Sequence, residues 1–102
     1  MAGSRERYRV DALAKGLRVL QCFNESDTRL RVSEMSALTD IPLTTTFRLA
    51  ATLETEGFLR RSNDGTLRPT AAMLTLGNAA LGSMSLVEIA TGHLEQLAQE
   101  LN

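Results

Sequence analysis

The sequence predicts a mainly α-helical fold with one small β-hairpin, and three observations lead to this prediction. From Asp11 to about Glu56, apolar residues recur at three- and four-residue spacing, which is typical of amphipathic helices. Residues 58–69 instead hold two short strand-like runs around an Asp-Gly pair, a strong hairpin signal. Helical spacing then returns from about Thr70 to the end of the chain. With 102 residues, the chain is long enough for one modest domain and short for two.

The first predicted helix begins at Asp11, after a polar and basic segment, residues 1–9, that we interpret as a flexible arm. Asp11 is the expected N-cap, because its carboxylate can accept hydrogen bonds from the free amides of the first turn. The apolar positions of this helix recur at Leu13, Leu17, Leu20 and Phe23. We expect the helix to end near Asn24, where Asn-Glu-Ser-Asp supplies turn residues.

Two further helices are predicted before the hairpin. Leu30-Arg31-Val32 is extended in character, and Ser33 is the expected N-cap of a short helix whose Met35 and Leu38 point to the core. Thr39-Asp40-Ile41-Pro42 interrupts this helix, because the residue before a proline disfavours helical geometry whereas proline suits a helix start. A third helix is expected from Leu43 to Glu56, ended by Gly57. Its candidate buried positions are Phe47, Leu49, Ala50 and Leu53.

The hairpin and the C-terminal helices follow. Strands within 58–62 and 66–69 flank Asn63-Asp64-Gly65, and Pro69 must end the second strand or lie on an edge. Thr70 is expected to cap a helix that Gly82-Ser83-Met84 breaks, and Ser85 with Glu88 forms a capping box for the last helix. That last helix is still amphipathic where the chain stops, so we expect a fragment or the start of a longer protein.

Composition and charge exclude several classes of protein. Hydrophobic residues make up 43% and charged residues 23%, as in an ordinary globular protein. No apolar run approaches the roughly 20 residues that span a bilayer, and no signal-type stretch follows MAGSRERYR, so we expect a cytoplasmic protein without a membrane partner. The single cysteine, Cys22, excludes an internal disulfide and a thiolate metal cluster.

The net charge of -1 conceals an uneven distribution. All 11 basic residues lie between Arg5 and Arg68, where nine acidic residues leave a net charge of +2, whereas residues 69–102 carry three acidic residues and no Lys or Arg. The pI near 5.8 argues against nonspecific coating of nucleic acid, but it allows contact with DNA through one face. The change in charge near Pro69 indicates two parts with different roles.

Helix, helix, turn, helix and hairpin in this order are typical of a winged helix-turn-helix, which we assign to residues 10–70. A short second helix braces the third, which can enter the major groove of DNA, while the hairpin reaches the backbone or the neighbouring minor groove. With Phe47, Ala50 and Leu53 facing inward, the threonines of 44–46 and Arg48 are free to face outward. Threonine offers a hydroxyl and a methyl to base edges, and Arg48 could contact either a guanine or a phosphate.

The wing adds basic residues of its own. Arg60, Arg61 and Arg68 are expected to supply phosphate affinity, with Arg61 favoured over Arg60 to share a face with Asn63. The candidate DNA-contacting residues are Ser33, Leu43, Thr44, Thr45, Thr46, Arg48, Arg60, Arg61, Asn63 and Arg68.

Residues 10–102 resemble the N-terminal part of the IclR (isocitrate lyase regulator) family of bacterial transcription regulators. The resemblance is carried by ALAKGLRVLQCF, RVSEMSALTDIPLTTTFRLAATLETEGFLRR, the NDGT turn, MLTLGNAAL and LVEIATGHLEQLAQELN, with residues 32–61 the most specific part. The opening YRVDALAKGL resembles the branch that controls aromatic-acid breakdown. One departure lies at the wing exit, where Leu67-Arg68-Pro69-Thr70 replaces the aromatic residue and Gly-Pro of many members.

The resemblance implies a sequence-specific regulator, repressor or activator, that reads a pseudo-palindromic operator in double-stranded DNA as a homodimer or a dimer of dimers. It also implies a linker helix over 71–84 and, over 85–102, the first helix of a truncated effector-binding domain. A small-molecule effector would then bind only through the missing C-terminal domain. We expect no cofactor and no metal, and a subunit interface that includes Leu13, Leu17, Leu74 and Leu81.

Other residues have two interpretations each. Arg5, Arg7 and Arg9 fit a minor-groove arm or a solvated tail equally well. Cys22 is more plausible as a packing thiol than as a redox sensor, and His93 lacks the spaced partners of a metal site.

An enzyme is not expected, since the sequence has no nucleophile elbow, no phosphate-binding glycine loop and no paired His and carboxylate motif. The alternative to a DNA reader is a winged helix used for protein–protein contact. The arginines of the third helix and the wing disfavour it, and a steep salt dependence of DNA binding would distinguish the two.

Overall fold

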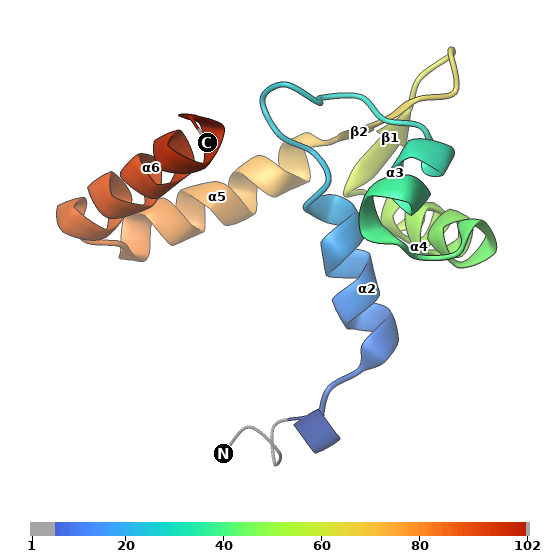
Figure 1. Cartoon of the computed structure of the whole chain (residues 1–102), viewed down its shortest axis with the longest axis horizontal. Helices are drawn as coiled ribbons and strands as arrows, with labels where there is room; N and C mark the ends of the chain where they lie inside the picture. The colour runs from blue at the N-terminus through green and yellow to red at the C-terminus, as the bar shows by residue number, and fades with distance from the viewer. Residues whose placement is uncertain (1–5, 102) are drawn as a thin grey trace. The chain divides into compact units, whose positions relative to one another are not determined.

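Residues 6–101 are described by a computed structural model, in which the elements follow the predicted order (Figure 1). Helices α2 (Asp11–Leu20), α3 (Val32–Thr39) and α4 (Leu43–Thr55) precede strands β1 (Leu59–Arg61) and β2 (Leu67–Pro69). Helices α5 (Ala71–Ser83) and α6 (Leu86–Leu101) follow. The chain divides into two compact units, Met1–Ala72 and Met73–Asn102. The predicted architecture, mainly helical with one antiparallel hairpin, is confirmed.

Helix α2 begins at Asp11, as the sequence indicated, but its N-cap differs from the prediction and it ends earlier. Val10, not Asp11, occupies the N-cap position, and no side chain caps this end. The Asp11 carboxylate instead pairs with Lys15 Nζ and Arg9 Nη1, each at 3.0 Å, and these partners lower the pKa of Asp11. At the other end, Asn24 Oδ1 accepts hydrogen bonds from the amides of Ser26 and Asp27. This local turn competes with helical hydrogen bonding, and the helix has already ended at Leu20.

Helix α3 begins earlier than expected. Arg31 occupies the N-cap position that we assigned to Ser33, and Val32 is already helical. The physical reason is Glu34, whose Oε1 accepts a hydrogen bond from the Arg31 amide at 2.9 Å and so fixes the N-cap two residues upstream of Ser33. The helix ends at Thr39, its C-cap Asp40 adopts the left-handed conformation at φ 58°, and Pro42 then occupies the N-cap position of α4.

The segment around Leu30, between α2 and α3, pairs with the hairpin as a third strand-like element. β1 and β2 pair antiparallel with Arg60 opposite Arg68, and Gly65 at φ 85° closes the three-residue Asn63-Asp64-Gly65 turn. Leu30 pairs with Leu67 through two backbone hydrogen bonds of 3.0 and 2.7 Å. The segment between α2 and α3 therefore borders the wing.

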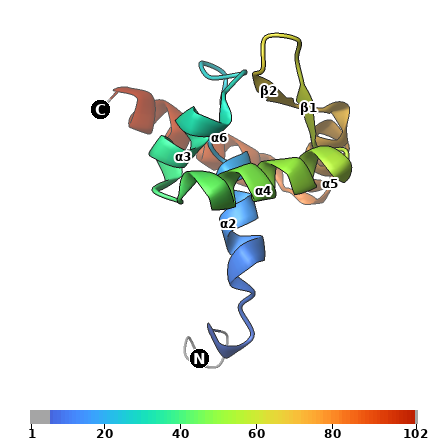
Figure 2. The same ribbon diagram turned by 90° about the vertical axis from the view of Figure 1, so that its right-hand side faces the viewer.

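The core lies where α2, α3, α4 and the wing meet. Figure 2 shows α3 above the N-terminal half of α4 and the hairpin above its C-terminal end. The buried apolar residues are Val19, Leu30, Met35, Ile41, Ala50, Leu59 and Leu67. Leu38, predicted to be in the core, is exposed, whereas Met35 is buried and Val32 packs against the core from the same helix.

Leu13 and Leu17 are also exposed, although both follow the apolar spacing of α2. The N-terminal half of α2 projects past α3 and α4 in both views (Figures 1 and 2), so no other element of the described unit covers it. These leucines are available for contacts outside the unit.

The second unit holds most of α5 and all of α6. Thr70 Oγ1 accepts the Ala72 amide hydrogen bond at 3.2 Å, as expected of a helix cap. The Ser85 and Glu88 capping box is present, with hydrogen bonds of 3.4 and 3.2 Å. Leu74, Leu81, Leu94 and Leu97 are exposed. No helix in the described part of the chain is long and apolar enough to span a membrane.

Candidate nucleic-acid interface

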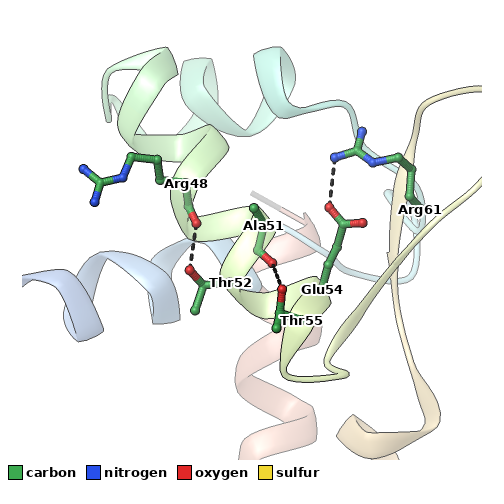
Figure 3. A network of polar contacts seen from close by, with 6 residues as sticks. All are labelled: Arg48, Ala51, Thr52, Glu54, Thr55 and Arg61. Carbon is green, nitrogen blue, oxygen red and sulfur yellow. Dashed lines mark hydrogen bonds and ion pairs between the residues drawn. The ribbon is translucent and has the colours of Figure 1, made fainter.

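The outward face of α4 carries part of the predicted DNA-contacting set. Leu43, Thr44 and Arg48 are exposed there, and Thr45 is half-buried. Arg48 has no acidic partner within 4 Å among the described residues, and its guanidinium points away from the other labelled side chains in Figure 3. Thr52 and Thr55, further along the helix, donate their hydroxyls to the backbone oxygens of residues 48 and 51. The side chains free to contact a ligand therefore lie at the N-terminal end of α4.

Thr46 was predicted to face outward, and this prediction is wrong. Its side chain is 0% exposed and belongs to the core. The Thr46 hydroxyl donates toward the backbone oxygens of Ile41 at 3.1 Å and Pro42 at 3.0 Å. Threonine can occupy this buried position because its hydroxyl is satisfied by the turn that precedes the helix. Thr46 therefore holds the turn between α3 and α4 and cannot contact DNA.

Phe47 was predicted to face inward, and it is instead 55% exposed. One residue corresponds to about 100° of rotation around an α-helix, so burying Thr46 and Ala50 turns Phe47 away from the core. Phe47 and Leu43, four residues apart, then lie on the same side of α4. The observed outward face is more apolar at this end than the sequence indicated.

The outer face of the wing carries two arginines directly opposite each other. Arg60 of β1 and Arg68 of β2 are register partners, and both are exposed. Their neighbours Leu59 and Leu67 are buried, so the alternation of a strand directs both arginines away from the core. Like charges directly opposite each other destabilise a strand pair, and an anion bound between them would relieve this repulsion.

Arg61 differs from the other wing arginines. Its Nη2 lies 2.9 Å from Glu54 Oε1 in an ion pair between β1 and α4 (Figure 3). Being half of a pair across two elements, Arg61 is partly neutralised and ties the wing to α4. Its expected role as a free phosphate ligand is therefore not supported by this geometry, although the side chain remains partly exposed.

Sequence reasoning missed Arg29 and Arg31. Both are exposed, and both flank Leu30, which pairs with Leu67 of the wing. Arg29 Nη1 lies 3.4 Å from Ser62 Oγ, and Arg29 lines an open depression of about 440 Å³ together with Arg60 and Arg68. The sequence analysis found extended character here but assigned the arginines no contact; the alternation Arg-Leu-Arg was the signal that both share a face opposite the buried leucine.

The tip of the wing holds Asn63 and Asp64. Both are exposed, and Asp64 Oδ1 accepts hydrogen bonds from the Thr66 hydroxyl at 2.6 Å and the Thr66 amide at 3.0 Å. These bonds, together with the charges of Arg29 and Arg31, lower the pKa of Asp64. The turn is therefore stabilised by an ionised carboxylate, while Asn63 is left free at the tip.

The remaining candidates lie outside this surface. Ser33 is exposed in the first turn of α3. Arg7 and Arg9 are exposed, with Arg9 paired to Asp11, and Arg5 falls outside the described residues. Cys22 is half-buried, its thiol lies 3.5 Å from the Arg18 carbonyl oxygen, and burial raises its pKa. Within residues 6–101, no three His, Cys, Asp or Glu side chains gather as metal ligands would.

Comparison with known families and relatives agrees with this geometry. The IclR helix-turn-helix domain family matches residues 12–63, which is about half of the chain. The HTH-type transcriptional regulator TsaQ1/TsaQ2 of Comamonas testosteroni is 38% identical over 93 residues, covering 88% of this chain and 32% of that protein.

Solved structures give the same result. An IclR family transcriptional regulator from Brucella abortus is 34% identical with a TM-score of 0.74, covering 84% of this chain and 33% of that one. An IclR homolog from Microbacterium hydrocarbonoxydans, complexed with 4-hydroxybenzoate, is 30% identical with a TM-score of 0.65, covering 88% of this chain and 38% of that one. The chain thus spans about a third of the length of these relatives. The Comamonas testosteroni and Brucella abortus proteins are both named as transcriptional regulators, the class that the sequence predicts.

Proposed function

Because the chain belongs to the IclR helix-turn-helix family, we propose that it binds specific sequences of double-stranded DNA and thereby regulates transcription. In this proposal the N-terminal end of α4 enters the major groove, and the outer face of the wing contacts the phosphate backbone. Arg48 with Thr44 and Thr45 would reach the bases or the phosphates beside them, and Ser33 would reach the backbone from α3. Asn63 at the wing tip would approach the neighbouring minor groove.

One observation carries the proposal. Arg60 and Arg68 lie on the wing, Arg29 and Arg31 lie on the segment that borders it, and Arg48 projects from α4. In the described part of the chain, none of their guanidinium groups has a carboxylate oxygen within 4 Å. Unpaired guanidinium groups on neighbouring elements give a chain of net charge -1 a local attraction for a polyanion. Helix α4 and the wing are the elements that a winged helix presents to DNA, and Arg29 and Arg31 flank the residue that pairs with the wing.

We further propose that two copies read the two halves of a pseudo-palindromic operator. A single winged helix of this size makes few contacts, and a two-fold dimer would present two α4 helices to half-sites one or more helical turns apart. The exposed Leu13 and Leu17 of α2 would contribute to the interface of the first unit, and Leu74 and Leu81 of α5 to that of the second. A dimer of dimers on DNA would extend the same arrangement.

Control by a small molecule is the last part of the proposal. Residues 71–84 would act as a linker helix, and residues 85–102 would begin the effector-binding region that accounts for the greater length of the relatives. A relative complexed with 4-hydroxybenzoate supports a small aromatic acid as the class of effector. Effector binding there would bias the spacing of the two winged helices.

The test uses duplexes enriched by this chain from a random library, compared with unselected duplex at several salt concentrations. We expect the logarithm of the affinity to fall steeply with the logarithm of the salt concentration, by about 0.9 for each phosphate neutralised. Arg48→Ala should weaken binding to the selected duplex by about 1–3 kcal/mol if Arg48 reads a base, and should weaken both duplexes equally if it contacts phosphate. A flat salt dependence, or no enrichment of any sequence, would instead favour the protein–protein alternative.

A further inference from the structure

Helix α4 exposes two large apolar side chains where a stable fold would bury them. Leu43 is 56% exposed and Phe47 is 55% exposed, while Thr46 between them is fully buried. Burying an aromatic or aliphatic side chain is among the largest favourable contributions to folding, so this arrangement forgoes stability. The two residues are one helical turn apart and form one surface, which we call the apolar pair.

The apolar pair lies on the side of α4 that borders the wing. Leu49 lies next to α2, since its Cδ2 is 4.0 Å from the position that a Cβ at Gly16 of α2 would take. Leu49 follows Phe47 by two residues, which is a rotation of about 200° around the helix. Glu54, which pairs with Arg61 of β1, follows Phe47 by seven residues and returns to nearly the same angular position. Phe47 therefore lies on the flank away from α2 and toward the wing.

The charged groups left unpaired on α4 and on the outer face of the wing are cationic. Arg48 follows Phe47 on α4, and Arg60 and Arg68 lie on the outer face of the wing, while Glu54 on the flank of Phe47 is paired with Arg61. A second copy that docked the same face would bring these arginines against each other, because a two-fold interface pairs identical patches. A complementary surface would offer an apolar group to the apolar pair and anionic groups to the arginines. In the major groove of DNA, the 5-methyl group of thymine is such a group, and phosphates line the groove on both sides.

We propose that Leu43 and Phe47 contact thymine 5-methyl groups in the major groove, so that the protein selects thymine at the corresponding positions of each half-site. The inference rests on the proposed DNA-binding function and adds to it the base that this end of α4 reads. Arg48 and the wing arginines hold the helix on the backbone, and the apolar pair distinguishes thymine from cytosine by the methyl group that only thymine carries.

The test removes only the methyl groups. A duplex enriched by the full 102-residue chain is prepared twice, with thymidine or with deoxyuridine throughout, and the dissociation constants of both are measured. We expect the deoxyuridine duplex to bind about fourfold more weakly for each methyl contact, or about 15-fold for two, since each buried methyl or methylene group contributes about 0.8 kcal/mol. Phe47→Ala and Leu43→Ala should each reduce this ratio, and the double variant should bring it to about one.

Leu38→Ala is the matched control, because Leu38 is also exposed but lies on α3. It should keep the ratio of the unmodified chain, and thermal melting should show that all variants are folded. Because deoxyuridine could also alter duplex shape, the decisive quantity is the change in the ratio between the chain and its variants. Equal binding to both duplexes, or a ratio that Phe47→Ala leaves unchanged, would overturn this inference while the DNA-binding proposal stands. A failure to enrich any duplex would overturn both.

Discussion

Replacing Thr46 with valine distinguishes the structural role of this residue from the DNA-contacting role that the sequence suggested. Valine has the same branched shape, so the substitution removes the hydroxyl without opening a cavity. Both carbonyl oxygens that the hydroxyl contacts keep another donor. Ile41 O still accepts from Ser36 Oγ at 2.6 Å, and Pro42 O still accepts from the residue 46 amide at 2.9 Å. The expected cost is therefore that of one hydrogen bond, about 1 kcal/mol, with no buried carbonyl left unsatisfied.

The measurement is urea unfolding combined with binding to an enriched duplex. A loss of about 1 kcal/mol in the free energy of unfolding corresponds to a fall in melting temperature of about 4–8 °C for a domain of this size. Affinity for the duplex, measured well below both unfolding midpoints, should not change. Thr44→Val is the matched control, because Thr44 is exposed and makes no side-chain hydrogen bond among the described contacts. It should leave stability within about 0.5 kcal/mol and lower the affinity.

The opposite result would refute the reasoning. If Thr46→Val weakened duplex binding while the free energy of unfolding stayed the same, the hydroxyl would have to face DNA, and the rotation of α4 described here would be wrong. An unfolding midpoint that fell for Thr44→Val but not for Thr46→Val would lead to the same conclusion.

Three further predictions concern the wing. Arg60→Ala and Arg68→Ala should each lower the slope of log affinity against log salt concentration by about one. Each should weaken binding to selected and random duplexes equally, whereas weaker binding to the selected duplex alone would indicate a base contact. Gly65→Ala should destabilise the chain by about 1 kcal/mol or more in urea unfolding, because φ is +85° and the added Cβ would lie 3.1 Å from a guanidinium nitrogen. Gly57→Ala should lower the free energy of unfolding by less, because φ is similar at Gly57 but nothing lies within 4 Å of the added Cβ. Equal losses for the two variants would show that crowding of the Cβ at Gly65 does not contribute. The pKa of Asp64 is held below its ordinary value of 3.8, so its ionised form stabilises the turn above that pH and this stabilisation is lost as the pH falls through the lowered pKa. Protection of the turn amides, measured as exchange relative to the intrinsic rate at each pH, should fall over that acidic range, and the Asp64→Asn variant should show no such fall.

Local sequence signals predicted the elements well, because their physics involves only neighbouring residues. Gly57 and Gly65 occupy positive-φ positions at the end of α4 and in the hairpin turn, where glycine carries no steric penalty. Thr70 and Ser85 begin α5 and α6 by hydrogen-bonding nearby amides. Capping was less reliable at α2 and α3. There, Asp11 and Ser33 were each a plausible N-cap, but Asp11 pairs with Lys15 and Arg9, and Glu34 binds the Arg31 amide upstream of Ser33.

The assignment of faces on α4 required the tertiary structure. The sequence of α4, LTTTFRLAATLET, fits a helical pattern with either Thr46 or Phe47 facing the core. The two arrangements differ only by a rotation of the helix of about 100° about its axis. The choice depended on contacts with α2 and α3 and on a hydroxyl that the Ile41–Pro42 turn could satisfy.

The sequence by itself thus determined the order of the elements, most of their turns and the presence of a basic winged helix, because each of these depends on residues that are near one another in the chain. Only the tertiary structure decided that Phe47 is outside and Thr46 inside, that Arg61 pairs with Glu54, and that Arg29 and Arg31 join the wing. These outcomes depend on packing and strand pairing between segments distant in sequence, for which no local pattern carries the necessary geometry.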